Sequence, residues 1–128
     1  MMLRECVRLA REEQRLVVFL EPIALYMAKD LHAPGDGGWL TAYPPPGQAM
    51  TFGEERVYHP EARDLVVFSF GNGVPMSLRA ARAIEARHGW KVRVVDLRWL
   101  VPLNEVAIAR HAAECERILV VDEGRRSA

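Results

Sequence analysis

The chain has 128 residues, and its balance of 50% hydrophobic and 27% charged residues is typical of a globular domain rather than a disordered segment. Lys and Arg together number 17, and so do Asp and Glu, so the formal net charge is zero. This neutrality gives no support for a nucleic-acid or anionic-membrane partner, because both partners require a positive field.

The first predicted elements are a helix over residues 3–13 and a strand over residues 16–20. Apolar side chains recur at helical spacing in the helix, and the following apolar, β-branched run is typical of a strand buried on both faces. This longest apolar run is far too short to cross a bilayer, and the first residues lack a signal-peptide core. We therefore expect a cytoplasmic protein in which Cys6 and Cys115 are buried, reduced thiols.

Residues 23–63 are expected to be largely irregular. Prolines and glycines punctuate this stretch densely, and three consecutive prolines at 44–46 favour an extended conformation. Because a connector of this length is unusual inside one compact domain, it predicts a crossing between two domains. A short strand is expected near residues 56–58.

Regular elements return after Asp64. The pattern predicts, in order, a strand at 65–68, a helix at 74–88 that stops at Gly89, a strand at 92–97, a helix capped by Asn104 and a strand at 118–121. This spacing is what right-handed crossovers between parallel strands require. The predicted fold class is α/β, with a mostly parallel sheet in a three-layer α/β/α arrangement.

Candidate ligand-binding residues lie where the predicted strands end, because ligands of parallel sheets bind outside the carboxyl ends of the strands. They are Gly71, Asn72, Gly73, Asp96, Arg98 and Glu123. The turn Gly71-x-Gly73-x-x-Ser77 opens a helix, and Asp96 ends the next strand, as in a dinucleotide-binding turn with an acidic ribose ligand. A simpler interpretation is that the glycines only permit a tight turn.

The other polar groups favour structural roles over chemistry. Arg98 either binds an anion or pairs locally, and Asp122 with Glu123 is either an acid/base pair or a helix cap beside a solvated carboxylate. Arg125 and Arg126 are expected to be solvated. The four histidines lack the spacing of metal ligands, so neither a metal ligand nor a catalytic residue is assigned.

Several stretches, in their order and spacing, resemble the dehydrogenase component of thiamine diphosphate-dependent 2-oxo acid dehydrogenase complexes. Residues 16–26, LVVFLEPIALY, resemble the last strand of its pyrimidine-binding domain. Its transketolase C-terminal domain is resembled by residues 64–74 (DLVVFSFGNGV), 95–104 (VDLRWLVPLN) and 118–123 (ILVVDE). The subgroup with α and β halves fused in one chain is resembled by residues 43–47 (YPPPG) and 124–127 (GRRS).

The resemblance implies a β-subunit-like part of an enzyme that oxidatively decarboxylates pyruvate or a branched-chain 2-oxo acid, using thiamine diphosphate and Mg²⁺. It divides the chain into the tail of the pyrimidine-binding domain at 1–26, a connector at 27–63 and a transketolase C-terminal-like domain at 64–128. The catalytic and cofactor-binding residues of the family would lie outside this sequence. The resemblance therefore implies an inactive fragment that binds no cofactor by itself.

The partners implied by the resemblance are the remaining dehydrogenase domains or subunits and the acyltransferase core of the complex. The family continues beyond the last residue of this sequence, so we expect a sheet that is incomplete at the C-terminus and a chain that self-associates. These expectations favour a scaffold for subunit assembly. Two alternatives stay open: an autonomous nucleotide-binding module built on the Gly71-x-Gly73 turn, and a plain homo-oligomerising domain.

Overall fold

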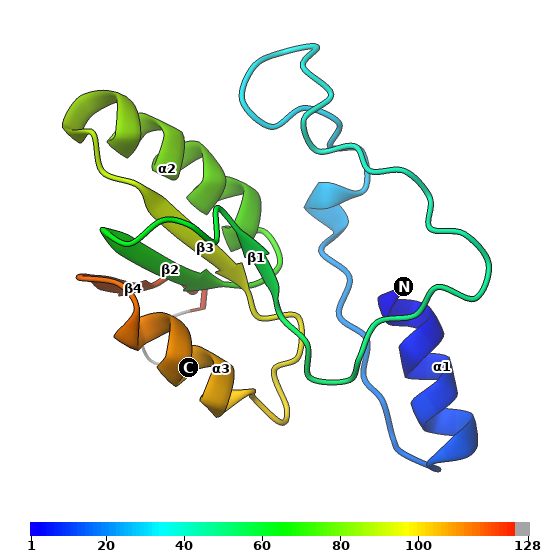
Figure 1. Cartoon of the computed structure of the whole chain (residues 1–128). Coiled ribbons are helices and arrows are strands. Elements are labelled where there is room, and N and C mark those ends of the chain that lie inside the picture. The colour runs from blue at the N-terminus through cyan, green and yellow to red at the C-terminus, as the bar shows by residue number, and fades with distance from the viewer. Residues whose placement is uncertain (125–128) are drawn as a thin grey trace.

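The computed structural model describes residues 1–124 (Figure 1). Its helices are α1 (Met2–Glu12), α2 (Gly73–His88) and α3 (Glu105–Ala113), with a short 3-10 helix, η1, at Ile23–Leu25. Its strands are β1 (Arg56–Tyr58), β2 (Leu65–Ser69), β3 (Val92–Asp96) and β4 (Ile118–Val120). No helix within residues 1–124 is long and apolar enough to cross a membrane. Arg125 and Arg126, and with them most of the stretch 124–127, lie outside the described residues.

The four strands form one mixed sheet in the order β1-β3-β2-β4. β2 pairs in parallel with β3 on one side and with β4 on the other, whereas β1 pairs antiparallel with β3 at the edge. Because the chain crosses to one side of β2 through α2 and returns to the other through α3, the two helices cover opposite faces (Figure 1). The predicted mostly parallel, three-layer α/β fold is confirmed.

The two faces of the sheet carry separate apolar cores. The core beneath α2 contains Leu65, Val67, Val74, Leu78, Ala81, Val92 and Val94. The core beneath α3 contains Val66, Phe68 and Val95, against which Ile108, Ala112 and Cys115 pack. Alternate residues of β2 thus point to opposite faces, and complete burial of each such side chain contributes about 1.5–3 kcal/mol. Leu78 and Ala81 of α2, and Ile108 and Ala112 of α3, thus face the sheet.

A third core joins α1 to the rest of the molecule. It consists of Cys6, Leu9, Met50 and Trp99, with Met2, Val17 and Phe52 packed against it. The Trp99 ring, in the turn after β3, meets the Phe52 ring edge-on at 4.8 Å between centroids. Helix α1 therefore packs on the connector and on the β3–α3 turn rather than on the sheet. Both cysteines are free thiols, Cys6 buried and Cys115 partly buried.

Carboxylates organise the irregular part of the connector. Asp36 accepts hydrogen bonds from the backbone amides of Leu31, His32, Ala33 and Gly38. These amides hold the pKa of Asp36 far below its ordinary value. The loop is fixed to α2 because Arg79 donates to the Leu31 carbonyl at 2.6 Å.

The prediction of a strand buried on both faces at residues 16–20 is wrong. The segment is extended but unpaired, and Leu16 is 96% exposed. A strand needs a neighbour that completes its hydrogen-bond ladder, and within residues 1–124 the sheet formed by β1 to β4 offers it none. The sequence pattern describes the side chains correctly, but it cannot supply the neighbouring strand.

Candidate functional site

The carboxyl ends of the parallel strands lie side by side at one end of the sheet. Ser69 at the end of β2 is in register with Asp96 at the end of β3, and β4 ends beside β2. The crossovers on the two sides of β2 run in opposite directions, so the gap between the ends of β2 and β4 is the topological switch point. In sheets of this kind this is where a ligand site is expected first.

The turn after β2 requires glycine at two positions, for different reasons. Gly71 has a φ of 54°, in the left-handed region that favours glycine. A side chain at Gly73 would place its Cβ 2.0 Å from Ser69 Oγ, and that hydroxyl donates to the Val121 carbonyl at 2.9 Å. The requirement for a tight turn therefore accounts for both glycines without a ligand.

Asn72 and Glu123 come together at the switch point. The Asn72 amide Nδ2 donates to Glu123 Oε2 at 3.2 Å. The other amide atom, Oδ1, is buried and has no hydrogen-bond partner among the described residues. Asp122 accepts instead from the Gly124 amide at 2.8 Å. The two adjacent carboxylates thus have separate hydrogen-bond partners.

Asp96 and Arg98 form a second polar group, also at the carboxyl end of the parallel strands. Arg98 Nε lies 3.5 Å from Asp96 Oδ2, and both side chains are largely buried. Burial raises the pKa of Asp96, although the Arg98 cation opposes this effect. The local pairing of Arg98 considered from the sequence is thus present. The sequence analysis did not single out Arg56. This residue is in register with Asp96, and its Cζ lies over the Tyr58 ring, 4.8 Å from the ring centroid.

A buried polar cluster away from this end of the sheet was also missed. The side chain of Arg93 on β3 is buried and bonds to His111 and Glu114. The only sequence sign is a charged residue inside the run Val92-Arg93-Val94-Val95. Its partners lie far away in sequence, so no local pattern identifies them.

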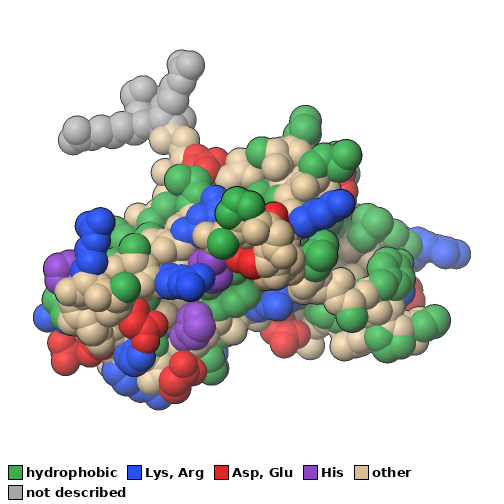
Figure 2. Space-filling view, turned by 90° about the horizontal axis from the view of Figure 1, so that it is seen from above, with side chains coloured by type: hydrophobic (Ala, Val, Ile, Leu, Met, Phe, Trp, Pro, Cys, Tyr) green, Lys and Arg blue, Asp and Glu red, His purple; other side chains and the backbone are tan. Residues whose placement is uncertain are grey.

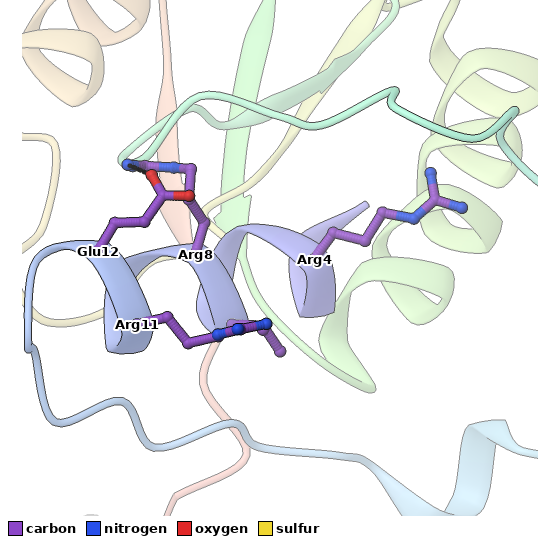
Figure 3. Close-up of a pocket in the computed structure, with 5 residues that line it drawn as sticks. Arg4, Arg8, Arg11 and Glu12 are labelled. Atoms are coloured by element: carbon purple, nitrogen blue, oxygen red, sulfur yellow. Dashed lines mark ion pairs between the residues drawn. The ribbon is translucent and has the colours of Figure 1, made fainter.

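A surface hollow of about 500 Å³ lies along α1, lined by Arg4, Val7, Arg8, Arg11 and Glu12 (Figure 3). Figure 3 shows Arg8 and Glu12 meeting over the helix while Arg4 extends away from them. Arg8 pairs with Glu5 and Glu12, and Arg4 donates to the Pro45 and Gln48 carbonyls. This is a solvated, charged helix face. In the part of the chain that the structure describes, no three His, Cys, Asp or Glu side chains gather as a metal site.

The sequence was compared with protein-family profiles and with known proteins. The family profile described as "Transketolase, C-terminal domain" matches residues 54–128. The 3-methyl-2-oxobutanoate dehydrogenase subunit beta of Mycobacterium tuberculosis is 33% identical over 111 residues, which cover 87% of this chain and 28% of that protein. This alignment covers more of the chain than the family profile does.

Two further relatives share shorter stretches. The pyruvate dehydrogenase E1 component subunit beta of Staphylococcus epidermidis is 34% identical over 53% of this chain and 21% of its own length. The 1-deoxy-D-xylulose-5-phosphate synthase 1 of Oryza sativa subsp. japonica is 37% identical over 61% of this chain and 11% of its own length. The chain thus spans less than a third of each of these relatives. The match over β1 to β4, with their α/β arrangement, shows that the chain belongs to the transketolase C-terminal domain family.

Proposed function

We propose that this chain is a β-subunit-like part of a thiamine diphosphate-dependent 2-oxo acid dehydrogenase, and that it serves subunit assembly rather than catalysis. The similarity to the β subunits of 3-methyl-2-oxobutanoate and pyruvate dehydrogenases supports this assignment. The substrates of the whole enzyme would be pyruvate or branched-chain 2-oxo acids. Its partners would be the other dehydrogenase domains or subunits, an acyltransferase core and further copies of the chain.

The proposed division of the chain is residues 1–26 as the tail of a pyrimidine-binding domain, 27–63 as the connector and 64–128 as the transketolase C-terminal-like domain. The separation of the apolar cores supports it. The cores on the two faces of the sheet draw mainly on residues after 64, whereas the core around Leu9 combines α1 and the connector with Trp99 from the turn after β3.

One observation carries the assembly role: residues 16–27 expose many large apolar side chains to solvent. The most exposed of them are Leu16, Val18, Leu20, Ile23, Tyr26 and Met27. Figure 2 shows hydrophobic side chains reaching the surface between charged ones on the face that it presents. Large exposed apolar patches of soluble proteins mark interaction sites. A partner that covers this segment would also supply the strand neighbour that it lacks.

The proposal places thiamine diphosphate and Mg²⁺ in the whole enzyme and assigns them no site in this chain. Hard cations such as Mg²⁺ bind through carboxylate oxygens and water. The carboxylates at the switch-point end of the sheet are engaged with Asn72, Arg98 and a backbone amide, and they offer no converging set within residues 1–124. We therefore derive no catalytic step from the residues of this chain.

Native mass spectrometry with and without thiamine diphosphate and Mg²⁺ tests the proposal. We expect a dimer or larger species that takes up no cofactor. Val18→Asp, on the exposed segment, should shift the population toward monomer, because a charge then enters the interface. Val106→Asp is the matched control, since that valine on α3 is 81% exposed and Val18 is 76% exposed. A stoichiometric cofactor complex, or a monomer at every concentration, would contradict the proposal.

The nucleotide-binding alternative has one observation in its favour, the unpartnered Asn72 Oδ1 beside the first turn of α2. A Gly73→Val variant cannot test it, because any side chain there meets Ser69. Asn72→Ala is a better probe, since it removes the unpartnered acceptor without placing a second carboxylate beside Glu123. Tight binding of an adenine nucleotide that this variant abolishes would favour the alternative over the assembly role.

A further inference from the structure

Residues 16–20 form an extended segment that makes no backbone–backbone hydrogen bond within the described part of the chain. Their side chains alternate in burial, as those of a strand do. Leu16, Val18 and Leu20 are exposed, whereas Val17 between them packs against the core beneath α1. The segment therefore has one anchored face, one free apolar face and an open row of backbone donors and acceptors.

The strand β4 has an open row of the same kind at the edge of the sheet opposite β1. Its only strand partner within residues 1–124 is β2. β2 bonds to the Arg117 carbonyl and to the Val121 amide, so these two residues turn their backbone groups toward β2. Because successive residues of a strand turn these groups to opposite sides, the amides and carbonyls of Ile118 and Val120 point away from the sheet. Such an exposed, apolar edge is a template for another strand.

The apolar side chains of β4 also await a neighbour. Ile118 and Val120 are in register with Val66 and Phe68, which belong to the core beneath α3. Residues in register point to the same face of a sheet, so Ile118 and Val120 extend this apolar face, and both are exposed. A further strand with apolar side chains on that face would cover them. The free face of residues 16–20 is of this kind.

Charges around the two stretches favour an antiparallel pairing between them. Val18 is the middle of one stretch and Val120 the middle of the other. Four charged residues stand three positions from these middles: Arg15, Glu21, Arg117 and Glu123. With the two valines opposite each other, an antiparallel pair sets each arginine against a glutamate. A parallel pair would set arginine against arginine and glutamate against glutamate, and like charges directly opposite each other destabilise a strand pair.

The segment lies away from β4 within one copy of the chain. Val17 packs in the core that contains Trp99, from the turn after β3, and β3 and β4 lie on different sides of β2. Figure 1 shows α1 and the blue segment that follows it on the opposite side of the picture from β4. The segment and the edge are therefore complementary but separated. A zero net charge removes the general repulsion that would keep two copies apart.

We propose that residues 16–20 of one copy add to β4 of a second copy as an antiparallel strand, with Val18 opposite Val120. The inference rests on the proposed assembly role and deepens it, because it names the partner and the surface that the partner uses. Main-chain hydrogen bonds hold the added strand, and alternate side chains select it. Each copy offers one segment and one edge, so two copies can fill both positions reciprocally, whereas one-way contacts extend into longer assemblies.

A disulfide between two different cysteine variants of the full chain tests the contact. Copies with Val18→Cys are mixed with copies that carry Val120→Cys and then oxidised. Directly opposite residues of an antiparallel pair have Cα atoms about 4.5–5.5 Å apart, which a disulfide can bridge. Peptide mass mapping should therefore find a bond between positions 18 and 120, distinct from any bond of the native Cys6 and Cys115. Val106→Cys replaces Val120→Cys in the matched control, because Val106 on α3 is also exposed, and no bond to position 18 should form.

Reversed charges give a second test, which needs no new cysteine. Glu21→Arg sets two arginines against each other, and Arg117→Glu sets two glutamates against each other. Each single variant should therefore raise the dissociation constant in sedimentation by about 2- to 10-fold. The double variant restores the pair with its signs exchanged and should recover the wild-type value. The two positions are far apart in one copy, so recovery reports a contact between copies.

The outcomes separate this inference from the assembly role on which it rests. The bond between positions 18 and 120, with recovery in the double variant, would support strand addition. An assembly that forms without this bond and without recovery would overturn strand addition, and the assembly role would stand. A chain that stays monomeric at every concentration would overturn both.

Discussion

Gly73 shows how a single backbone position is fixed by a side chain from the preceding strand. A Cβ at this position would lie 2.0 Å from Ser69 Oγ, and that hydroxyl is held by the Val121 carbonyl. Gly73→Ala should therefore destabilise the fold by about 1–3 kcal/mol, the usual range for overpacking. Urea unfolding of Gly73→Ala, Ser69→Ala and the double variant measures this effect. The double variant should lose less than the sum of the single variants, and simple additivity would contradict the assigned clash.

Asp36 gives a residue-scale prediction on pH. Four backbone amides donate to its carboxylate and depress its pKa. A depressed pKa contributes stability that is present above the unfolded value, near 3.9, and is lost as the pH falls below it. We expect the loop of residues 30–38 to loosen progressively as the pH falls below about 4 toward the depressed pKa, while Asp36→Asn should loosen it at neutral pH as well. NMR spectra recorded along a pH titration would show this, and a loop unchanged in both cases would contradict the prediction.

Helix α3 begins with a cap that the sequence predicted and the structure confirms. Asn104 Oδ1 accepts from the Ala107 amide at 3.0 Å, while Nδ2 donates to the Gly53 carbonyl at 3.0 Å. Asn104→Ala should cost about 1 kcal/mol, the usual value of a lost N-cap. Asn104→Asp keeps the cap but not the donor to Gly53, so it should cost less in urea unfolding. A larger loss for the aspartate variant would mean that repulsion between its carboxylate and the Gly53 carbonyl outweighs the retained cap.

Elements were predicted correctly where residues within the segment determine them. They were missed where the determining residues lie far away in sequence. β2, α2, β3, α3 and β4 follow from apolar periodicity, capping residues and turn residues within each segment. Residues 16–20 carry the side chains of a buried strand, yet a strand also needs a neighbour, and no neighbour is encoded in the segment itself. The same holds for the candidate site. The turn residues 71–73 stood out by composition, whereas the burial of Arg93 depends on Pro60 and His111, to which it bonds.

At the scale of the whole molecule, the buried apolar side chains of α1 belong to one small core around Leu9. Leu9 is buried with Cys6, Met50 and Trp99, and this core is separate from those of the sheet. Leu9→Ala should cost about 2–5 kcal/mol locally, as for other leucines removed from cores. The loss should appear as a changed Trp99 fluorescence and as faster hydrogen exchange in α1. Unchanged or slower exchange in α1 would contradict the prediction, and an equal loss of protection in β2 would show that the cores are coupled.

The strand order β1-β3-β2-β4 has a consequence for the chain as it leaves the ribosome. β1 is synthesised before the other strands, but β3, its only strand partner within residues 1–124, emerges after β2 and α2. The unit β2–α2–β3 can form without upstream residues, because its parallel pair is closed by its own crossover. During translation β1 must therefore wait unpaired until this unit has folded. At this edge of the sheet, the strand that is synthesised first is therefore not the first to find its partner.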